Sequence, residues 1–131
     1  MDKLPMQYEF RFMVRGYEID SFGHVNNAVY LNYLEQARWE ILRSADLFGY
    51  FSQNGLILVV AEASIRYSRE AKVFDELVCG TDISRDPPYL VFSHAIRTAR
   101  TGELIARGSI KTLLVDRDRI PHDIPAFFPG A

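Results

Sequence analysis

The chain has 131 residues, of which 48% are hydrophobic, 24% are charged and 13% are aromatic, and its formal net charge is −2. This length predicts a single domain over residues 1–131 with one core. The net charge gives no indication of the basic surface that most nucleic-acid-binding proteins have. The sequence contains no run of about 18 consecutive apolar residues, so no membrane-spanning helix is expected. With Cys79 as the one cysteine, no intramolecular disulfide can form, and we expect a cytoplasmic protein with a buried, inert thiol.

Two patterns follow each other in the first half of the chain. Residues 8–14 alternate between apolar and charged side chains, which predicts a strand. After the loop at residues 20–27 the apolar period becomes helical and continues to Phe48, so we expect one long helix that ends at Gly49. Its apolar side is wide enough to be wrapped by a sheet.

The second half of the chain predicts strands only. Four β-rich runs are separated by short turns, and they cover residues 56–68, 76–84, 89–99 and 104–115. The turns at Arg85–Pro88 and Arg100–Gly102 are typical of antiparallel neighbours. Residues 121–131, with three prolines, are expected to form an irregular tail. The order predicts an α+β fold, with an antiparallel sheet around one helix.

The start of the long helix carries the main chemical signal. Asn26 is a good N-cap, which makes Asn27 the first helical residue with a free backbone N–H. Together with the helix dipole, such donors stabilise an anion, including the oxyanion formed when a thioester is attacked. Asp20, a few residues upstream, would supply a nucleophile or general base.

The same residues also have a structural interpretation. An Asp before a helix more often forms a cap or an Asx turn, and a single loop histidine such as His24 more often makes a structural hydrogen bond. His94 and His122 show no metal-ligand spacing with His24, so no metal site is expected.

A family resemblance favours the catalytic interpretation. The stretch Arg15–Asn27 contains Asp-x-x-Gly-His-Val-Asn-Asn, and similarity continues through Tyr30, Tyr33, Glu35, Ala37 and Arg38. It resembles the signature of the 4-hydroxybenzoyl-CoA thioesterase family of hot-dog proteins, which hydrolyse acyl-CoA or acyl-carrier-protein thioesters. The resemblance implies a five-stranded antiparallel sheet wrapped around one long central helix. It also implies a homodimer or a dimer of dimers with shared active sites, and a reaction without metal or redox cofactor.

The resemblance also implies roles for individual residues. Asp20 matches the catalytic carboxylate, and Asn27 matches the backbone oxyanion donor. The remaining expected substrate-binding positions are Gly23, His24, Val25, Tyr30, Val60 and Glu62. Val60 and Glu62 would approach the partner's Asp20, and Tyr30 is expected in the core with its hydroxyl near the cleft. The proposed coenzyme A phosphate contacts are Arg66, Arg69, Lys72 and Arg85.

Three alternatives remain open at the level of the sequence. The turn Ser84–Pro88 lacks the basic run that related enzymes often use for coenzyme A, so an acyl-carrier protein competes as the thiol carrier. A non-catalytic hot-dog protein that binds an acyl group is the second alternative. A dehydratase of the same fold is the third, and the pairing of Asp20 with Asn27 favours hydrolysis over it.

Overall fold

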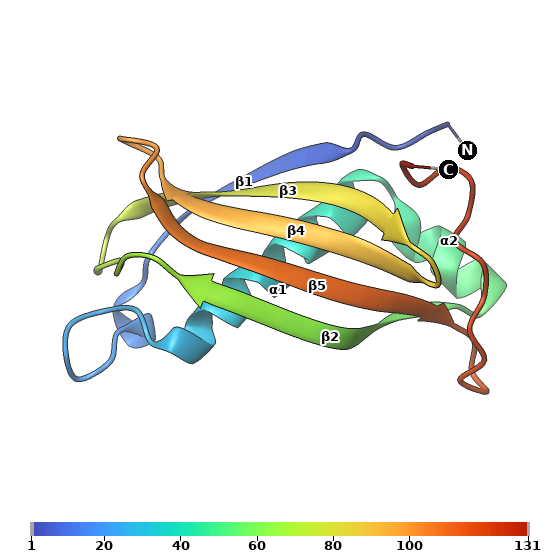
Figure 1. Cartoon of the computed structure of the whole chain (residues 1–131), viewed down its shortest axis with the longest axis horizontal. Helices are drawn as coiled ribbons and strands as arrows, with labels where there is room; N and C mark the ends of the chain where they lie inside the picture. Colours follow the sequence, from blue (N-terminus) through green and yellow to red (C-terminus); the bar gives the residue numbers. More distant parts are fainter. Residues whose placement is uncertain (1, 131) are drawn as a thin grey trace.

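The computed structural model describes residues 2–130, which form one sheet and two α-helices. The strands are β1 (Gln7–Met13), β2 (Ile57–Tyr67), β3 (Glu76–Asp86), β4 (Tyr89–Thr98) and β5 (Leu104–Val115). The helices are α1 (Asn27–Ser44) and α2 (Leu47–Asn54). The antiparallel sheet has the order β1-β3-β4-β5-β2 and curls around α1 (Figure 1). The predicted α+β architecture is confirmed.

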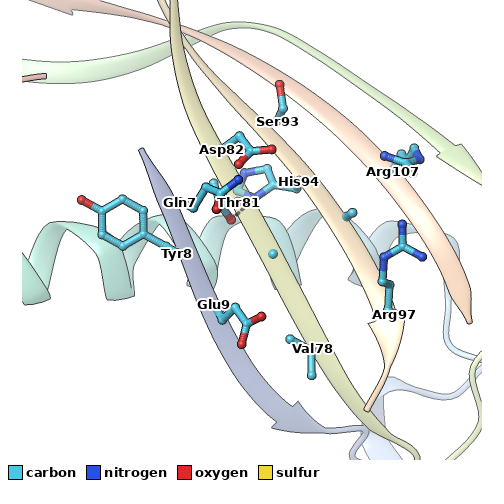
Figure 2. Close-up of a pocket in the computed structure, with 12 residues that line it drawn as sticks. Gln7, Tyr8, Glu9, Val78, Thr81, Asp82, Ser93, His94, Arg97 and Arg107 are labelled. Atoms are coloured by element: carbon cyan, nitrogen blue, oxygen red, sulfur yellow. Dashed lines mark hydrogen bonds between the residues drawn. The ribbon is translucent and has the colours of Figure 1, made fainter. Parts of the chain in front are cut away.

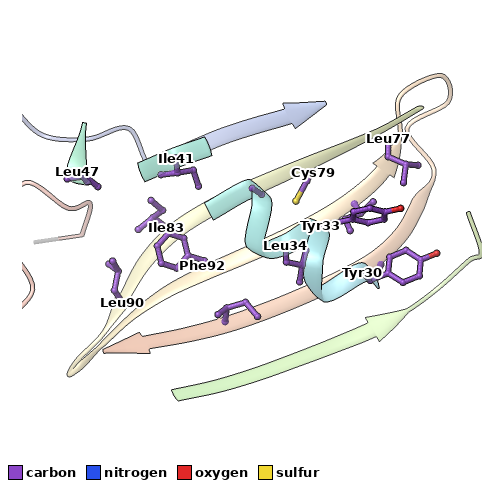
Figure 3. Packing of buried hydrophobic residues seen from close by; sticks show 14 of the residues in the cluster. Tyr30, Tyr33, Leu34, Ile41, Leu47, Leu77, Cys79, Ile83, Leu90 and Phe92 are labelled. Atoms are coloured by element: carbon purple, nitrogen blue, oxygen red, sulfur yellow. The ribbon is translucent and has the colours of Figure 1, made fainter. Parts of the chain in front are cut away.

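The core lies between the concave face of the sheet and one side of α1. Each strand of the sheet's centre alternates between buried and more exposed residues, so every second side chain points at the helix. The helix contributes Tyr30, Tyr33, Leu34, Ala37 and Ile41, all at most 3% exposed (Figure 3). The predicted apolar period of the helix is therefore confirmed over α1.

Helix α1 approaches strand β5 most closely at Gly108. A Cβ atom added there would overlap Leu34 Cδ1 and would lie 3.4 Å from the carbonyl oxygen of Ser64. Glycine at this position leaves room for Leu34 and lets the helix pack closely against the sheet.

The prediction of one helix ending at Gly49 is wrong. Asp46 adopts a left-handed backbone conformation (φ 53°) that ends α1 and redirects the chain into α2. Gly49 lies inside α2, and Gly55 (φ 64°) caps its C-terminus instead. The apolar spacing continued across the break because Leu47 and Phe51 of α2 bury against the same core.

The C-terminal segment contains no helix or strand between residues 122 and 130, yet it is held in place. Phe127 and Phe128 are buried, and the ring of Phe127 packs edge-on against Tyr50 of α2. The guanidinium of Arg85 donates hydrogen bonds to four carbonyl oxygens of this segment, those of Ile124, Pro125, Phe128 and Pro129. We call this arrangement the Arg85 clasp.

Candidate active site

The loop between β1 and α1 is closed by its own backbone. An isolated bridge pairs Ile19 with Val25, and the N–H of Asp20 donates to the carbonyl of His24 at 2.8 Å. Gly23 turns the chain with a positive φ of 83°, which disfavours residues with a Cβ. These contacts hold Asp20 beside the start of α1.

The carboxylate of Asp20 has one structural and one available oxygen. Its Oδ1 accepts the N–H of Phe22 at 2.9 Å and that of His24 at 3.3 Å, so the Asx turn considered from the sequence is present. Within residues 2–130, Oδ2 accepts no hydrogen bond. Because only one oxygen is occupied, the loop function and a chemical function of Asp20 are compatible.

The first turn of α1 presents a free donor, as the sequence predicts. Asn26 caps the helix through its Oδ1, which accepts the N–H of Ala28 at 3.0 Å. The N–H of Asn27 has no acceptor in the described part of the chain. The hydroxyl of Tyr67 donates to the carbonyl of Asn27 at 2.9 Å and ties the end of β2 to the start of the helix.

Asp20 and Asn27 face one cleft of about 690 Å³. Its other lining residues come from the loop, from the end of β2, from the segment that follows it and from the turn between β4 and β5: His24, Val25, Tyr67, Ser68, Arg69, Glu70, Lys72 and Glu103. The cleft therefore combines a carboxylate with a helix N-terminus, which is the pairing that acyl transfer to water requires.

A buried carboxylate, that of Glu18, stabilises the loop and was not identified from the sequence. Glu18 is 6% exposed, and its Oε1 accepts the hydroxyl of Tyr33 at 2.9 Å and the N–H of Arg15 at 2.7 Å. Its backbone carbonyl accepts the N–H of Asn26 at 2.9 Å. Burial, and then the hydrogen bond to Glu18, raise the pKa of Tyr33 above its ordinary value, so its hydroxyl remains a donor.

Tyr30 is buried under the cleft and does not line it. Its hydroxyl accepts the N–H of Ala71 at 3.2 Å, and its ring packs edge-on against Tyr67. The predicted core position is confirmed, and the hydroxyl holds the cleft wall.

His24 stands at the cleft edge with a carboxylate partner. Its Nε2 lies 3.1 Å from Glu70 Oε2, and both side chains are partly exposed. The pair lies at one side of the cleft. Within residues 2–130, the imidazole of His24 makes no hydrogen bond to the side chain of Asp20.

The four predicted phosphate contacts separate in space. Arg69 and Lys72 line the cleft, although Arg69 Nε also lies 3.1 Å from Glu103 Oε1. Arg66 pairs with Arg107 on β5, between the inward-facing Ala106 and Gly108, so it lies on the outer face of the sheet. Arg85 is occupied in the clasp, so we take neither Arg66 nor Arg85 into the proposed site.

Val60 and Glu62 lie on the edge strand β2, away from the cleft of their own chain. A bulge between them changes the alternation, and Glu62 pairs with Lys111, which faces outward between buried Ile110 and Thr112. Glu62 thus lies on the outer face of the sheet, and we leave it out of the site. Val60 points inward and lines a second, apolar pocket.

The apolar pocket, of about 430 Å³, lies between α1, α2 and the β2 side of the sheet. Its walls are mostly aromatic and aliphatic, and the lining residues are Glu35, Arg38, Trp39, Leu42, Phe48, Phe51, Ser52, Leu56, Ile57, Leu58, Val60, Phe92 and Thr112. An apolar cavity with few polar groups is the usual form of a small-molecule site.

A polar cluster not predicted from the sequence lies beside this pocket, in the core. The imidazole of His94, 2% exposed, contacts Thr81 Oγ1 at 2.8 Å through Nδ1, as Figure 2 shows, and Arg38 Nη1 at 3.3 Å through Nε2. Burial, and then the charge of Arg38, lower the pKa of His94 to about 3. Cys79 is buried as predicted, and burial raises its pKa to about 11.

Known proteins share this fold. A 1,4-dihydroxy-2-naphthoyl-CoA thioesterase from Synechocystis superposes with a TM-score of 0.83 over 92% of this chain and 91% of its own, at 20% identity. YbaW, a probable thioesterase from Escherichia coli, has a TM-score of 0.80 at 30% identity, covering 90% and 89%. The architecture is that of the hot-dog thioesterases, which confirms the predicted fold.

Sequence comparison defines the family. Residues 14–130 match the thioesterase-like superfamily, and the chain belongs to it. The long-chain acyl-CoA thioesterase FadM of Escherichia coli K12 is 33% identical over 104 residues, 79% of each chain. The chloroplastic acyl-acyl carrier protein thioesterase ATL3 of Arabidopsis thaliana is 30% identical over 121 residues, which are 91% of this chain and 64% of that protein. The predicted enzyme class, a thioesterase, is confirmed.

Among residues 2–130, no helix has the length and apolar character needed to cross a membrane.

Proposed function

We propose that the protein hydrolyses an acyl-CoA thioester to a free acid and coenzyme A. The observation that carries the proposal is that one cleft is lined by Asp20, whose Oδ2 accepts no hydrogen bond in the described chain, and by Asn27, whose N–H has no acceptor there. A carbonyl oxygen placed at that N–H is polarised by one donor and by the positive end of an 18-residue helix.

Asp20 then acts by one of two routes. As a general base it removes a proton from water, the hydroxide adds to the carbonyl carbon, and collapse of the oxyanion breaks the C–S bond. As a nucleophile it forms an anhydride with loss of thiolate, and water then releases the acid. In both routes the thiolate takes up a proton, and Asn27 stabilises the same oxyanion.

The charged residues of the cleft bear on the choice of thiol carrier. Arg69 and Lys72 line the cleft and would contact the phosphate groups of the thiol carrier, although Glu70 and Glu103 lie in the same wall. The names of FadM and ATL3 refer to acyl-CoA and acyl-carrier-protein substrates, respectively. We favour coenzyme A and treat the carrier protein as the alternative. Within the superfamily, the signature Asp20–Asn27 supports placement near the 4-hydroxybenzoyl-CoA thioesterases.

We further propose a homodimer formed through β2. This strand is an edge of the sheet, it exposes Ile57 and Val60 by 50% and 53%, and nothing in the described chain pairs with its free side. Such an edge is a ready site for a second strand. If two β2 strands pair antiparallel about a two-fold axis, the apolar pocket near Ile57 in one chain comes beside Tyr67 and the cleft of its partner.

The decisive experiment compares wild type with Asp20→Asn. Asparagine retains Oδ1 as acceptor for Phe22 and His24, so the loop keeps its hydrogen bonds while the charge and the base are lost. We expect turnover of acyl-CoA, followed by thiol release, to fall on the order of 10²-fold or more. An unchanged thermal midpoint shows that the fold is intact.

Equal turnover by both proteins would contradict the role of Asp20. If wild type releases no thiol from any acyl-CoA but cleaves acyl-carrier-protein substrates, the alternative carrier is correct. Binding of acyl thioesters without cleavage would instead establish a non-catalytic acyl-binding protein.

A further inference from the structure

Arg38 is an unusual wall residue for the apolar pocket. Its side chain is half-buried among Trp39, Phe92 and Thr112, while Glu35 lies in the same wall. Among residues 2–130 no carboxylate oxygen lies within 4.0 Å of the guanidinium, so Arg38 forms no salt bridge. Burial lowers the pKa of Arg38 although the charge of Glu35 acts in the opposite direction. A half-buried cation without a hydrogen-bonded anion costs free energy unless something else compensates it.

The one hydrogen bond that Arg38 makes in the described chain is to a neutral ring. Arginine only donates, so His94 Nε2 must be the acceptor and the ring proton resides on Nδ1, where it is donated to Thr81 Oγ1. Burial keeps the pKa of His94 low, so the imidazole stays uncharged at neutral pH and accepts from Arg38. The ring fixes one nitrogen of the guanidinium and leaves its other donors for a ligand.

We propose that Arg38 is a specificity-determining residue that selects acyl groups bearing an acceptor oxygen on the chain, most strongly a carboxylate. This inference rests on the proposed function and on the proposed β2 dimer, since it takes the apolar pocket beside the partner's cleft as the site of the acyl chain. The aliphatic part of the ligand packs against the aromatic walls, and its oxygen takes the donors of Arg38 that His94 does not use. His94 acts as a positioning residue.

The pocket contains its own reporter. Trp39 is the one tryptophan of the chain and lines the pocket, so its fluorescence reports occupancy without any need for turnover. We would titrate decanoate and decanol into wild type and into Arg38→Met, which keeps an apolar side chain of similar length. A charge-assisted hydrogen bond predicts that wild type binds decanoate about tenfold more tightly than decanol, and that Arg38→Met loses this preference.

A matched control is available on the same helix. Arg43→Met removes a guanidinium that is exposed, pairs with Glu40 and does not line this pocket. We expect it to retain the wild-type preference, and Arg38→Lys to retain part of it, because the charge stays while the planar donor pair is lost. Equal decanoate and decanol affinities in wild type, or an equal loss in Arg43→Met, would overturn the proposal.

Turnover separates this inference from the proposed function. The ratio of kcat/KM for 9-carboxynonanoyl-CoA to that for decanoyl-CoA should fall about tenfold in Arg38→Met, while decanoyl-CoA itself is still cleaved. Absence of hydrolysis in every protein, with the decanoate preference intact, would contradict the proposed hydrolysis and leave the pocket assignment standing. Hydrolysis of both substrates with an unchanged kcat/KM ratio in Arg38→Met would support the proposed hydrolysis and contradict the role of Arg38.

Discussion

His94 shows how one side chain in the core ties stability to pH. Its ring is neutral in the folded state, because burial and the adjacent Arg38 lower its pKa to about 3, whereas in the unfolded chain it returns to its ordinary value of 6.5. Between these values the unfolded state binds a proton that the folded state does not. Stability from this group is therefore complete above pH 6.5 and is lost as the pH falls toward 3.

We predict that unfolding free energy contributed by His94 declines below pH 6.5 by up to about 1.4 kcal/mol per pH unit. His94→Gln offers an acceptor to Arg38 and a donor to Thr81 but does not titrate, so its profile should be flatter over this range. Chemical denaturation at several pH values measures the difference. Parallel profiles for the two proteins would show that His94 is not the titrating group.

Residues differed in how far the sequence could predict them. The Asx turn of Asp20 and the helix cap at Asn26 could be predicted because their contacts are local, whereas the proposed catalytic roles of Asp20 and Asn27 came from the family resemblance. Glu18 and Arg38 were not given roles, because their partners Tyr33 and His94 lie 15 and 56 residues away. Such pairings depend on how the sheet curls around α1, which a pattern of apolar positions does not specify.

In the proposed site, α1 has the most roles among the elements, since its first residue would supply the oxyanion donor and its C-terminal half lines the apolar pocket. The backbone at Asn26, with φ −58° and ψ 133°, is the conformation favoured before a proline. Proline at the first helical position is also well tolerated. The donor at position 27 can therefore be deleted with little change to the helix.

We predict that Asn27→Pro lowers kcat by roughly 10²-fold, the usual cost of one lost oxyanion donor, with a thermal midpoint close to wild type. The matched variant Asn27→Ala keeps the backbone N–H and loses only the side chain, so it should retain most activity. If Asn27→Ala is as impaired as Asn27→Pro, the side chain and not the N–H is the important group.

The limits of prediction are also clear at this scale. All five strands were predicted within two residues of their bounds, because alternation and turn residues agree. The division between α1 and α2 was missed because both helices bury residues on one continuous surface. The chain turns at Asp46, which is neither glycine nor proline and so gave no sign of a break. Val60 and Glu62 were both predicted to be substrate-binding positions. The bulge between them, which turns Glu62 outward, leaves no trace in the sequence pattern.

For the whole molecule, the positions of the apolar pocket and the cleft along β2 lead to a prediction about how two chains assemble. The apolar pocket is lined by residues at the start of β2, and the cleft by Tyr67 at its end. Antiparallel pairing of two β2 strands brings each pocket beside the other chain's cleft. We therefore expect a species of twice the 15.1 kDa chain mass in sedimentation.

Mixing two inactive variants tests whether the sites are shared. Asp20→Asn removes the chemistry, and Val60→Trp fills the pocket. In a mixed dimer one site combines the intact cleft of one chain with the intact pocket of the other, so co-refolding should restore up to about a quarter of wild-type activity. No recovery, with both variants folded and dimeric, would place pocket and cleft of one site in the same chain.

The Arg85 clasp has a practical consequence for handling the enzyme. By anchoring the C-terminal segment, it holds Phe127, whose carbonyl accepts the N–H of Leu4 at 2.8 Å, so the first and last described segments run beside each other. Figure 1 shows the first and last described segments near α2, whereas the Asp20 loop lies at the opposite end of α1, a helix about 27 Å long at 1.5 Å per residue. A fusion partner or a surface linker attached at either end would therefore lie away from the cleft of its own chain, and a short peptide joining the ends would give a circular permutant with a new opening elsewhere.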